Sequence, residues 1–362
     1  MHHPSSSNPD ICIAGAGIIS LSLALELHHR GLRVTVLDQS APLAEASTAA
    51  AGMLAAQDPD NPPQLRPLAN LSLSLYPEFL DRLYNFSNIR VPFQTHTTLQ
   101  ALPRNHSSSN QLTDEDLSHL LPALIPTGHR FILLDEHSLD PRQLAAALLA
   151  SIRATTIDLR PNTAILSTCS INNSVETITT AGAIHSSHFI DCSGAWAATT
   201  SPLPHLPVVP RKGQMLAIAL PPSLPLHFVV RTPDIYIVPR TTGPSAGRAI
   251  IGATIEDVGF DKSIHPTDIQ HLRFLASTLL PPVADAQQLE AWSGLRPATP
   301  DGLPLLGALP EHPNHFIATG HYRNGILLAP ATAHLMAQLL TGETPSIDLT
   351  SFSTTRVTPQ PA

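Results

Sequence analysis

Residues 11–38 read ICIAGAGIISLSLALELHHRGLRVTVLD, and this stretch decides the fold. It contains an apolar strand over residues 11–14, a glycine turn, a leucine-rich helix over residues 17–30 and a second strand over residues 33–37. Gly31 follows the helix, where glycine is a favoured capping residue. The order strand, turn, helix, strand predicts a Rossmann-like α/β fold built on a parallel sheet.

The turn GAGIIS, residues 15–20, is a G-x-G-x-x-G pattern with Ser20 in place of the third glycine. Gly15 permits the tight turn, and Gly17 lets the backbone approach a pyrophosphate at the amino end of the helix. Asp38 lies 21 residues after Gly17, where a carboxylate accepts hydrogen bonds from ribose hydroxyls and repels a 2′-phosphate. The pattern therefore predicts a dinucleotide other than NADP. The alternative is a glycine-rich turn that binds no cofactor.

Charge and cysteine content limit the class of protein. The 362 residues carry a formal net charge of −8, which argues against a nucleic-acid or anionic membrane surface. No run is apolar enough over sufficient length to span a membrane, and Asp10 argues against a signal peptide over residues 11–27. Cys12, Cys169 and Cys192 are far apart, which predicts free thiols in a reducing compartment. We therefore expect a soluble, cytoplasmic protein.

Further segments suggest where other strands and loops lie. Residues 235–239 and 249–253 alternate like antiparallel strands, and the turn-rich TTGPSAG between them predicts a hairpin. Residues 189–194 and 316–320 are short apolar strands that end on glycine, as parallel strands do beside a ligand. Prolines cluster in connecting segments, residues 58–67 and 202–210, and NHSSSNQ, residues 105–111, predicts an exposed loop. The histidine pairs at residues 2–3 and 28–29 lack the spacing of a helical metal site, so no metal is expected.

After Asp38, the segment EASTAAAGML, residues 45–54, is rich in small residues. An isoalloxazine ring needs the close backbone approach that such residues allow, whereas a nicotinamide dehydrogenase would continue with another βαβ unit. This segment, the Gly15 turn, Gly294-Leu295-Arg296-Pro297 and residues 320–326, GHYRNGI, resemble the D-amino-acid oxidase family of FAD-dependent oxidoreductases. The resemblance is strongest to its glycine oxidase branch, the enzyme of thiazole synthesis in thiamine biosynthesis. It extends from about residue 10 to about residue 342.

The resemblance implies a division of the chain. A Rossmann-like FAD-binding domain would be assembled from residues 10–85, 137–200 and 291–345. A substrate-binding domain, an α+β unit on an antiparallel sheet, would take residues 86–136 and 201–290. Residues 1–9 would form a disordered tail and residues 346–362 a C-terminal tail.

The resemblance and the glycine pattern together indicate the cofactor contacts. Residue 165 fits a strand whose backbone meets the adenine, and Ser193-Gly194-Ala195-Trp196 resembles a second flavin-facing turn. We expect FAD to contact Gly15, Gly17, Ile18, Ile19, Asp38, Gln39, Ala46, Ser47, Ala51, Gly52, Met53, Ile165, Gly194, His321, Tyr322, Arg323, Asn324, Gly325, Ile326 and Leu327.

Arg296 stands out because residues 291–340 contain only four charged residues besides histidine: Arg296, Asp301, Glu311 and Arg323. A buried arginine needs a partner, and a carboxylate can accept two parallel hydrogen bonds from a guanidinium. In the family pattern the arginine of the Gly-Leu-Arg-Pro motif binds the substrate carboxylate, and that role falls on Arg296. A structural ion pair with Asp301, or a bond to a C-terminal carbonyl, is the alternative.

Arg323 precedes an apolar helix that extends to Leu340. A helix amino end aimed at the flavin pyrimidine would stabilise negative charge there, and Arg323 would add to that field or help to hold the substrate. Pro330 fits this helix if it lies in the first turn, where proline is tolerated. The alternative for Arg323 is a capping contact or a salt bridge between domains.

Three further residues are assigned to the substrate pocket by the resemblance. The Tyr236 hydroxyl would bind the carboxylate, while Ile255 and Met53 would limit substrate size; each could equally be a core residue. Arg296, Tyr236 and Arg323 are therefore the expected catalytic and substrate-binding residues. Lys212-Gly213-Gln214 resembles a family turn for which the sequence offers no catalytic role.

The activity that the resemblance implies is oxidative deamination of glycine or another small amino acid by hydride transfer to FAD. The products would be an imino acid that hydrolyses to glyoxylate, ammonia, and hydrogen peroxide from molecular oxygen. Sarcosine, proline or a larger D-amino acid as substrate, and a flavin-binding protein without turnover, remain alternatives. The expected partners are a small amino acid and oxygen, with no nucleic acid and no membrane; a homo-oligomer is left open.

Overall fold

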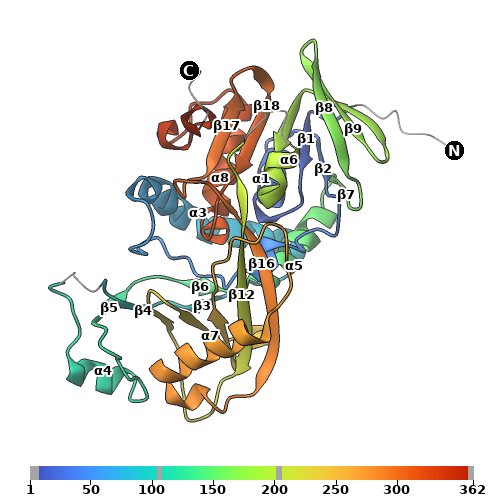
Figure 1. Cartoon of the computed structure of the whole chain (residues 1–362). Coiled ribbons are helices and arrows are strands. Elements are labelled where there is room, and N and C mark those ends of the chain that lie inside the picture. The colour runs from blue at the N-terminus through green and yellow to red at the C-terminus, as the bar shows by residue number, and fades with distance from the viewer. Residues whose placement is uncertain (1–7, 104–107, 201–205, 358–362) are drawn as a thin grey trace.

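The computed structural model describes residues 8–103, 108–200 and 206–357. Within them the strands form sheets of six, seven, three and two strands. Figure 1 shows the six-stranded sheet and its helices in the upper part and the seven-stranded sheet in the lower part, with β12 (Val209–Ala219) and β16 (Gln288–Ala298) extending between them. Most of the expected disordered tail and parts of the expected 105–111 loop and 202–210 connection lie outside the described residues.

The six-stranded sheet has the order β17-β18-β11-β1-β2-β7, and its neighbours are parallel except for the pair β17 and β18. All four residues of β1 and of β2 are buried, because helices or other strands cover both faces of a parallel sheet. The predicted Rossmann-like α/β class is confirmed. The strands are β1 (Ile11–Ala14), β2 (Val34–Leu37), β7 (Asp158–Arg160), β11 (His188–Asp191), β17 (Leu305–Leu309) and β18 (His312–Thr319).

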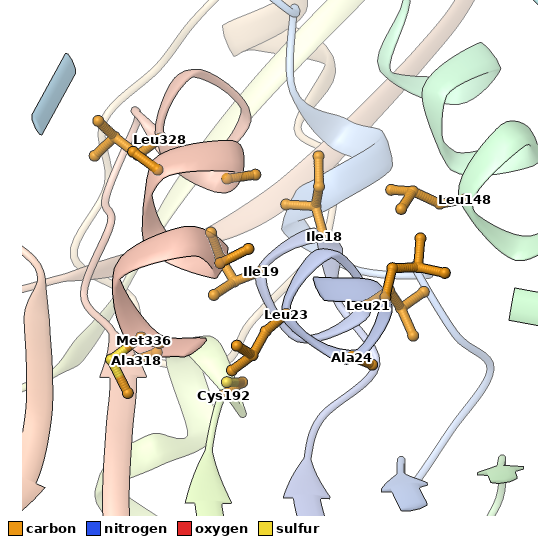
Figure 2. Close-up of a cluster of buried hydrophobic side chains, with 14 of the residues drawn as sticks. Ile18, Ile19, Leu21, Leu23, Ala24, Leu148, Cys192, Ala318, Leu328 and Met336 are labelled. Atoms are coloured by element: carbon orange, nitrogen blue, oxygen red, sulfur yellow. The ribbon is translucent and has the colours of Figure 1, made fainter. Parts of the chain in front are cut away.

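Two long helices, α1 (Ile18–His29) and α8 (Gly325–Leu340), pack against this sheet, and two more, α3 (Arg66–Ser87) and α5 (Pro141–Arg153), pack against them. α1 packs against both α8 and α5, and α3 packs against the same two helices. α1 is apolar on nearly every side because it is enclosed, as expected of a helix in the interior. Figure 2 shows α1 end-on between α8 and α5, with Ile19, Leu23, Leu148, Leu328 and Met336 among the packed side chains.

The seven-stranded sheet has the order β16-β12-β15-β14-β13-β4-β5. Its strands are antiparallel to their neighbours except for β13 and β4, and α7 (Pro266–Leu279) packs against β12 and β15. The predicted hairpin is confirmed as β14 and β15, which pair antiparallel. The remaining strands of this sheet are β4 (Thr98–Ala101), β5 (Phe131–Leu134), β13 (Val229–Arg231), β14 (Tyr236–Arg240) and β15 (Arg248–Gly252).

Smaller elements complete the described chain. The three-stranded sheet has the order β10-β9-β8, and the two-stranded sheet pairs β3 with β6. These strands are β3 (Phe93–Thr95), β6 (Ser138–Leu139), β8 (Ile165–Ile171), β9 (Ser174–Thr179) and β10 (Gly182–Ser186). The short helices are α2 (Ala46–Ala49), α4 (Asp114–Leu120), α6 (Ala197–Thr200), η1 (Pro63–Leu65), η2 (Gly194–Trp196), η3 (Gly243–Ser245), η4 (Pro281–Val283), η5 (Thr350–Phe352) and η6 (Thr354–Val357).

Two expectations about the division of the chain need refinement. The expected boundary between residues 290 and 291 lies inside β16, so the seven-stranded sheet extends beyond it. Residues 346–357, the described part of the segment expected as a C-terminal tail, fold back onto the protein: Phe352 is 1 % exposed, and Arg356 forms an ion pair of 2.8 Å with Asp301. The division into a flavin domain and a substrate domain remains a proposal.

The prediction that Pro330 lies in the first turn of its helix is wrong. Pro330 is the sixth residue of α8. Proline has no N–H to donate to the carbonyl four residues earlier, which belongs to Ile326. The buried hydroxyl of Tyr76, from α3, donates to that carbonyl oxygen instead. A side chain from a neighbouring helix thus satisfies the backbone acceptor that proline leaves open.

The three cysteines are free thiols, as predicted, with Cys12 and Cys192 buried and Cys169 exposed. Among the helices of the described chain, none has the length and apolar character that a membrane span requires.

Candidate active site

A cavity of about 710 Å³ lies between the two large sheets and is lined by residues from both. On one side it meets the carboxyl ends of the parallel strands, at Gly15, Asp38, Ser193 and Thr319. Ligands of open α/β sheets bind at this edge. Its volume falls within the range of roughly 300–1,000 Å³ that is usual for cofactor and ligand sites.

The glycine turn is shaped by its surroundings. Gly15 has a φ of +85°, and a side chain there would approach Cys192 O to 2.6 Å. α1 begins at the cavity, where its N-cap residue Gly17 provides no side-chain cap and the N–H of Ile18 donates to Ser47 Oγ at 2.9 Å. The amino end of the helix therefore presents N–H groups and its positive dipole to the cavity, which suits the pyrophosphate of a dinucleotide.

Asp38 has a second function that the sequence did not indicate. Its Oδ2 accepts from the N–H of Ala16 at 2.7 Å, and its Oδ1 accepts from the N–H of Ser40 at 2.8 Å. Asp38 therefore holds the glycine turn in shape while it lines the cavity. Oδ1 also accepts from Ser40 Oγ at 3.1 Å, so Oδ2 is the oxygen with a further lone pair, to which a ribose hydroxyl can donate.

The structure brings together nearly all of the predicted cofactor contacts. Every residue of that set lines the cavity except Leu327, which is 1 % exposed and packs in the core with α1 and α3. The contact between Leu327 and FAD stays a prediction, because Leu327 does not line the cavity although the preceding residue, Ile326, does. The glycine turn, the amino end of α1 at the cavity and the cavity volume fit an FAD molecule.

Arg296 lies on β16 and lines the cavity. Its Nη1 donates to Lys212 O at 3.3 Å and to Thr254 O at 3.2 Å. In the described part of the chain, no carboxylate forms an ion pair with Arg296, and Asp301 pairs with Arg356 instead. The alternative of an Arg296–Asp301 ion pair is therefore wrong, and the guanidinium retains the capacity to bind an anion.

Glycines opposite Arg296 and Tyr236 make room for both side chains. A Cβ on Gly213, in the neighbouring strand β12, would overlap with the Arg296 guanidinium. A Cβ on Gly252, in β15, would overlap with the Tyr236 phenol. The segment Lys212-Gly213-Gln214, which the sequence analysis compared with a turn, lies within strand β12 instead, and its glycine shapes the pocket around Arg296.

Tyr236 interacts with Arg296 at the cavity wall. Burial raises the pKa of the Tyr236 phenol above its usual value, and the charge of Arg296 and a hydrogen bond from it oppose the shift. The phenol is therefore protonated at neutral pH and can donate a hydrogen bond to a carboxylate. Met53 and Ile255 line the same cavity; Met53 is partly buried, whereas Ile255 is 62 % exposed.

Arg323 also lines the cavity, but it has partners within the protein. Its Nη2 lies 2.8 Å from Asp58 Oδ2, and its Nη1 lies 3.6 Å from Asp60 Oδ2. Arg323 therefore forms a salt bridge, but Asp58 and Asp60 lie in the same expected domain as Arg323, so this is not the salt bridge between domains given as the alternative. Asp58 also lies 3.8 Å from Nε of Arg231, a residue that the sequence did not single out.

Arg231 and Glu136 complete this charge cluster. Arg231 is 5 % exposed, and its Nη2 lies 2.9 Å from Glu136 Oε2. Burial raises the pKa of the Glu136 carboxyl, and the positive charge of Arg231 opposes that shift. The sequence could have indicated Arg231, because the run FVVR, residues 228–231, places a charge at the end of an apolar segment. The sequence DPDNPP, residues 58–63, has no pattern that would indicate a role for Asp58.

His321, in the motif before α8, is fully buried beside the cavity. Its Nε2 lies 3.0 Å from Thr332 Oγ1, and burial lowers the pKa of the imidazole to about 3. The ring is therefore neutral at physiological pH and fixes the segment from which Tyr322, Arg323 and Asn324 face the cavity.

Comparison with known proteins agrees with this geometry. Residues 10–339 match the model of the FAD dependent oxidoreductase family. A glycine oxidase from Geobacillus kaustophilus is 32 % identical over 96 % of this chain and 97 % of its own length. The crystal structure of glycine oxidase from that organism superimposes with a TM-score of 0.88, at 31 % identity, covering 98 % of this chain and 100 % of the other.

Other relatives are longer. A bifunctional protein ThiO/ThiG from Trichormus variabilis is 36 % identical over 91 % of this chain but only 52 % of its own length, so the chain spans about half of that relative. The match of the family model across most of the chain, with the dinucleotide turn and the cavity at the carboxyl edge of the sheet, shows that this chain belongs to the DAO family of FAD-dependent oxidoreductases.

Proposed function

We propose that this chain catalyses the FAD-dependent oxidative deamination of glycine or another small amino acid. The products are an imino acid, which hydrolyses to glyoxylate and ammonia in the case of glycine, and hydrogen peroxide. The observation that carries the proposal is Arg296, a cavity-lining guanidinium without a carboxylate partner in the described chain, next to a protonated Tyr236. Relatives named glycine oxidase support it.

Arg296 binds the substrate carboxylate in this proposal. Two parallel hydrogen bonds from the guanidinium fix its orientation, and the Tyr236 hydroxyl donates a third. The carbonyls of Lys212 and Thr254 hold the guanidinium from behind. Fixed orientation of the substrate in this way lowers the entropic part of the barrier, so positioning supplies much of the rate.

FAD would be held by the turn at Gly15 and Gly17, by Asp38 at the ribose and by the residues before α8. When bound, FAD supplies the two-electron acceptor for the hydride of the substrate carbon and the site at which oxygen is reduced. The proton of the amine leaves to solvent, and no protein base needs to take a carbon-bound proton. The amino end of α8, where Gly325 and Ile326 line the cavity, would favour negative charge on the ring system of a bound FAD.

A place in thiazole synthesis for thiamine is part of the proposal, and it rests on the family resemblance and on the relatives named ThiO/ThiG. We propose glycine, oxygen and a cytoplasmic location for this chain on the same grounds. The oligomeric state is left open.

The test is hydrogen peroxide formation by the purified, FAD-loaded protein with glycine, sarcosine, D-alanine and D-proline. We expect glycine to react, and Arg296→Ala to raise the apparent KM by about 100-fold while FAD stays bound, because a hydrogen-bonded charge is lost. Arg211→Ala is the matched control. Arg211 lies opposite Arg296 in the register of β12 and β16, but its guanidinium forms an ion pair with Asp257 at 3.6 Å.

Turnover of only sarcosine, proline or larger D-amino acids would replace glycine as the substrate. No turnover of any of them, with FAD bound, would favour a flavin-binding protein without activity. Unchanged kinetics in Arg296→Ala would reject the carboxylate-binding role.

A further inference from the structure

Asp58 is placed between two arginines at the wall of the substrate cavity. Its Oδ2 lies 2.8 Å from Nη2 of Arg323 and 3.8 Å from Nε of Arg231, and its side chain is only 10 % exposed. All three residues line the same cavity as Arg296. Arg231 comes from β13 of the seven-stranded sheet and Arg323 from the segment before α8, so Asp58 links the two parts of the molecule.

The cluster lies within electrostatic range of the pocket that receives the substrate. Tyr236, beside Arg296, senses the charge of Arg323, since that charge helps to lower the pKa of the phenol against the larger effect of burial. Arg231 carries a buried Nη1 for which the described residues offer no hydrogen-bond acceptor. If Asp58 were neutral, Arg323 would lose its shortest ion pair, and Arg323 together with Nη1 of Arg231 could attract a second anion.

The charges of the cluster do not leave a positive surplus. Two guanidinium groups, of Arg231 and Arg323, face the carboxyls of Asp58 and Glu136 and the more exposed Asp60. A ligand anion near Arg323 would meet the charge of Asp58 at short range, in surroundings where water screens poorly. Arg296 is thus the one cavity arginine of these three that stands ready for a carboxylate.

We propose that Asp58 is a specificity-determining residue that restricts the substrate to amino acids with a single carboxylate. By neutralising Arg323 and Arg231 it repels a second carboxylate, while a neutral side chain of the same size is tolerated. Selectivity in this form comes from a repulsive group aimed at the wrong ligand. The inference rests on the proposed amino-acid oxidase function and adds a charge filter to it.

The test compares ligands that have the same shape and differ in charge. Malonate and malonamate are non-oxidisable, and their dissociation constants follow from the change in visible absorbance of the FAD-loaded protein. We expect the wild type to bind malonate more weakly than malonamate by about tenfold or more, and Asp58→Asn to reduce or reverse that ratio by a similar factor. The kcat/KM values for D-asparagine and D-aspartate should shift in the same direction.

Asp60→Asn is the matched control, because Asp60 is 65 % exposed and lies farther from Arg323, at 3.6 Å. Its malonate-to-malonamate ratio should stay close to that of the wild type. In the Asp58→Asn variant, Arg323 is expected to attract the second carboxylate of malonate. A double variant, Asp58→Asn with Arg323→Gln, lacks that guanidinium and should therefore lose the gain in malonate binding. Asp58→Ser carries the same expectation as Asp58→Asn and replaces it if that variant does not fold.

Equal binding of malonate and malonamate by the wild type would overturn the proposal without any variant. An unchanged ratio in Asp58→Asn or Asp58→Ser would also overturn it. Failure of the proposed function looks different: the wild type would give no hydrogen peroxide with glycine, whereas the binding ratios would still report on the charge filter.

Discussion

At the level of single residues, the pocket depends on two glycines whose lack of a side chain leaves room for Arg296 and Tyr236. Gly213 and Gly252 carry no side chain, and only for that reason can Arg296 and Tyr236 reach the cavity from adjacent strands. The motif Gly-Leu-Arg-Pro indicated Arg296 from the sequence. The requirement for Gly213 became evident only from the register between β12 and β16, which the sequence does not specify.

We expect Gly213→Ala to raise the dissociation constant of acetate, and the KM of glycine, by about tenfold or more. The added methyl group would displace the Arg296 guanidinium, and small displacements of a positioning group are costly. The measurement is the change in flavin absorbance on titration with acetate, at saturating FAD. In an Arg296→Ala background the same substitution should add nothing, since the two changes act on one group. Independent, additive effects would contradict the proposed overlap.

The charge cluster around Asp58 could be predicted from the sequence only in part. Arg231 and Arg323 lie at the ends of apolar segments and could be singled out by that pattern. Their common partner comes from a proline-rich connection between α2 and η1 and is brought to them only by the tertiary fold. No local pattern of charge or hydropathy links residues so far apart in the chain.

At the level of elements, the sequence predicted those whose apolar runs end on glycine or on a turn. α1, β2, β11, β18 and the hairpin of β14 and β15 were expected within a few residues of their bounds. The position of Pro330 was predicted wrongly, because the start of α8 at Gly325 depends on the preceding turn. The compensation by Tyr76 comes from another helix, and helix packing of this kind leaves no local sequence signal.

We expect Tyr76→Phe to lower the free energy of unfolding by about 1–3 kcal/mol, because it leaves the buried carbonyl of Ile326 without a donor. Urea unfolding of the FAD-loaded protein measures this. Tyr84→Phe, on the same helix, is the control: its ring packs under Arg90, and among the described contacts its hydroxyl has none to lose. In a Pro330→Ala background, where the N–H of residue 330 can serve Ile326, the cost of Tyr76→Phe should shrink. Equal costs in both backgrounds would reject the compensation.

At the level of the whole molecule, the six-stranded and the seven-stranded sheet enclose one cavity. The six-stranded sheet draws its strands from the beginning, the middle and the end of the chain, and the resemblance to a family was needed to expect that division. Contacts across the two parts are polar as well as apolar, such as the ion pair of 2.9 Å between Lys262 and Glu45. Pairing of distant segments is set by the complete fold, so sequence patterns could indicate the pieces but not all of their boundaries.

Stability should fall in mild acid because His321 is buried as a neutral ring. Its pKa in the folded protein is lowered to about 3, whereas an unfolded histidine titrates near 6.5. The stabilising contribution is therefore complete above about pH 6.5 and is lost progressively as the pH falls towards about 3, with a slope approaching about 1.4 kcal/mol per pH unit.

Urea unfolding between about pH 7.5 and pH 5, at saturating FAD, measures this dependence in a range where most carboxyls remain ionised. His321→Gln should remove about one proton from the slope. His271→Gln, at an exposed position on α7, controls for the loss of one imidazole. A slope that His321→Gln leaves unchanged would show that this ring does not govern acid stability.

The most direct measurement of all is the visible absorption spectrum of the purified protein before and after anaerobic addition of glycine. We expect the bands of oxidised flavin, present on purification or restored by added FAD, and their bleaching by glycine. A colourless protein that takes up no FAD, or flavin bands that glycine does not change, would contradict the function proposed for this cavity and for Arg296.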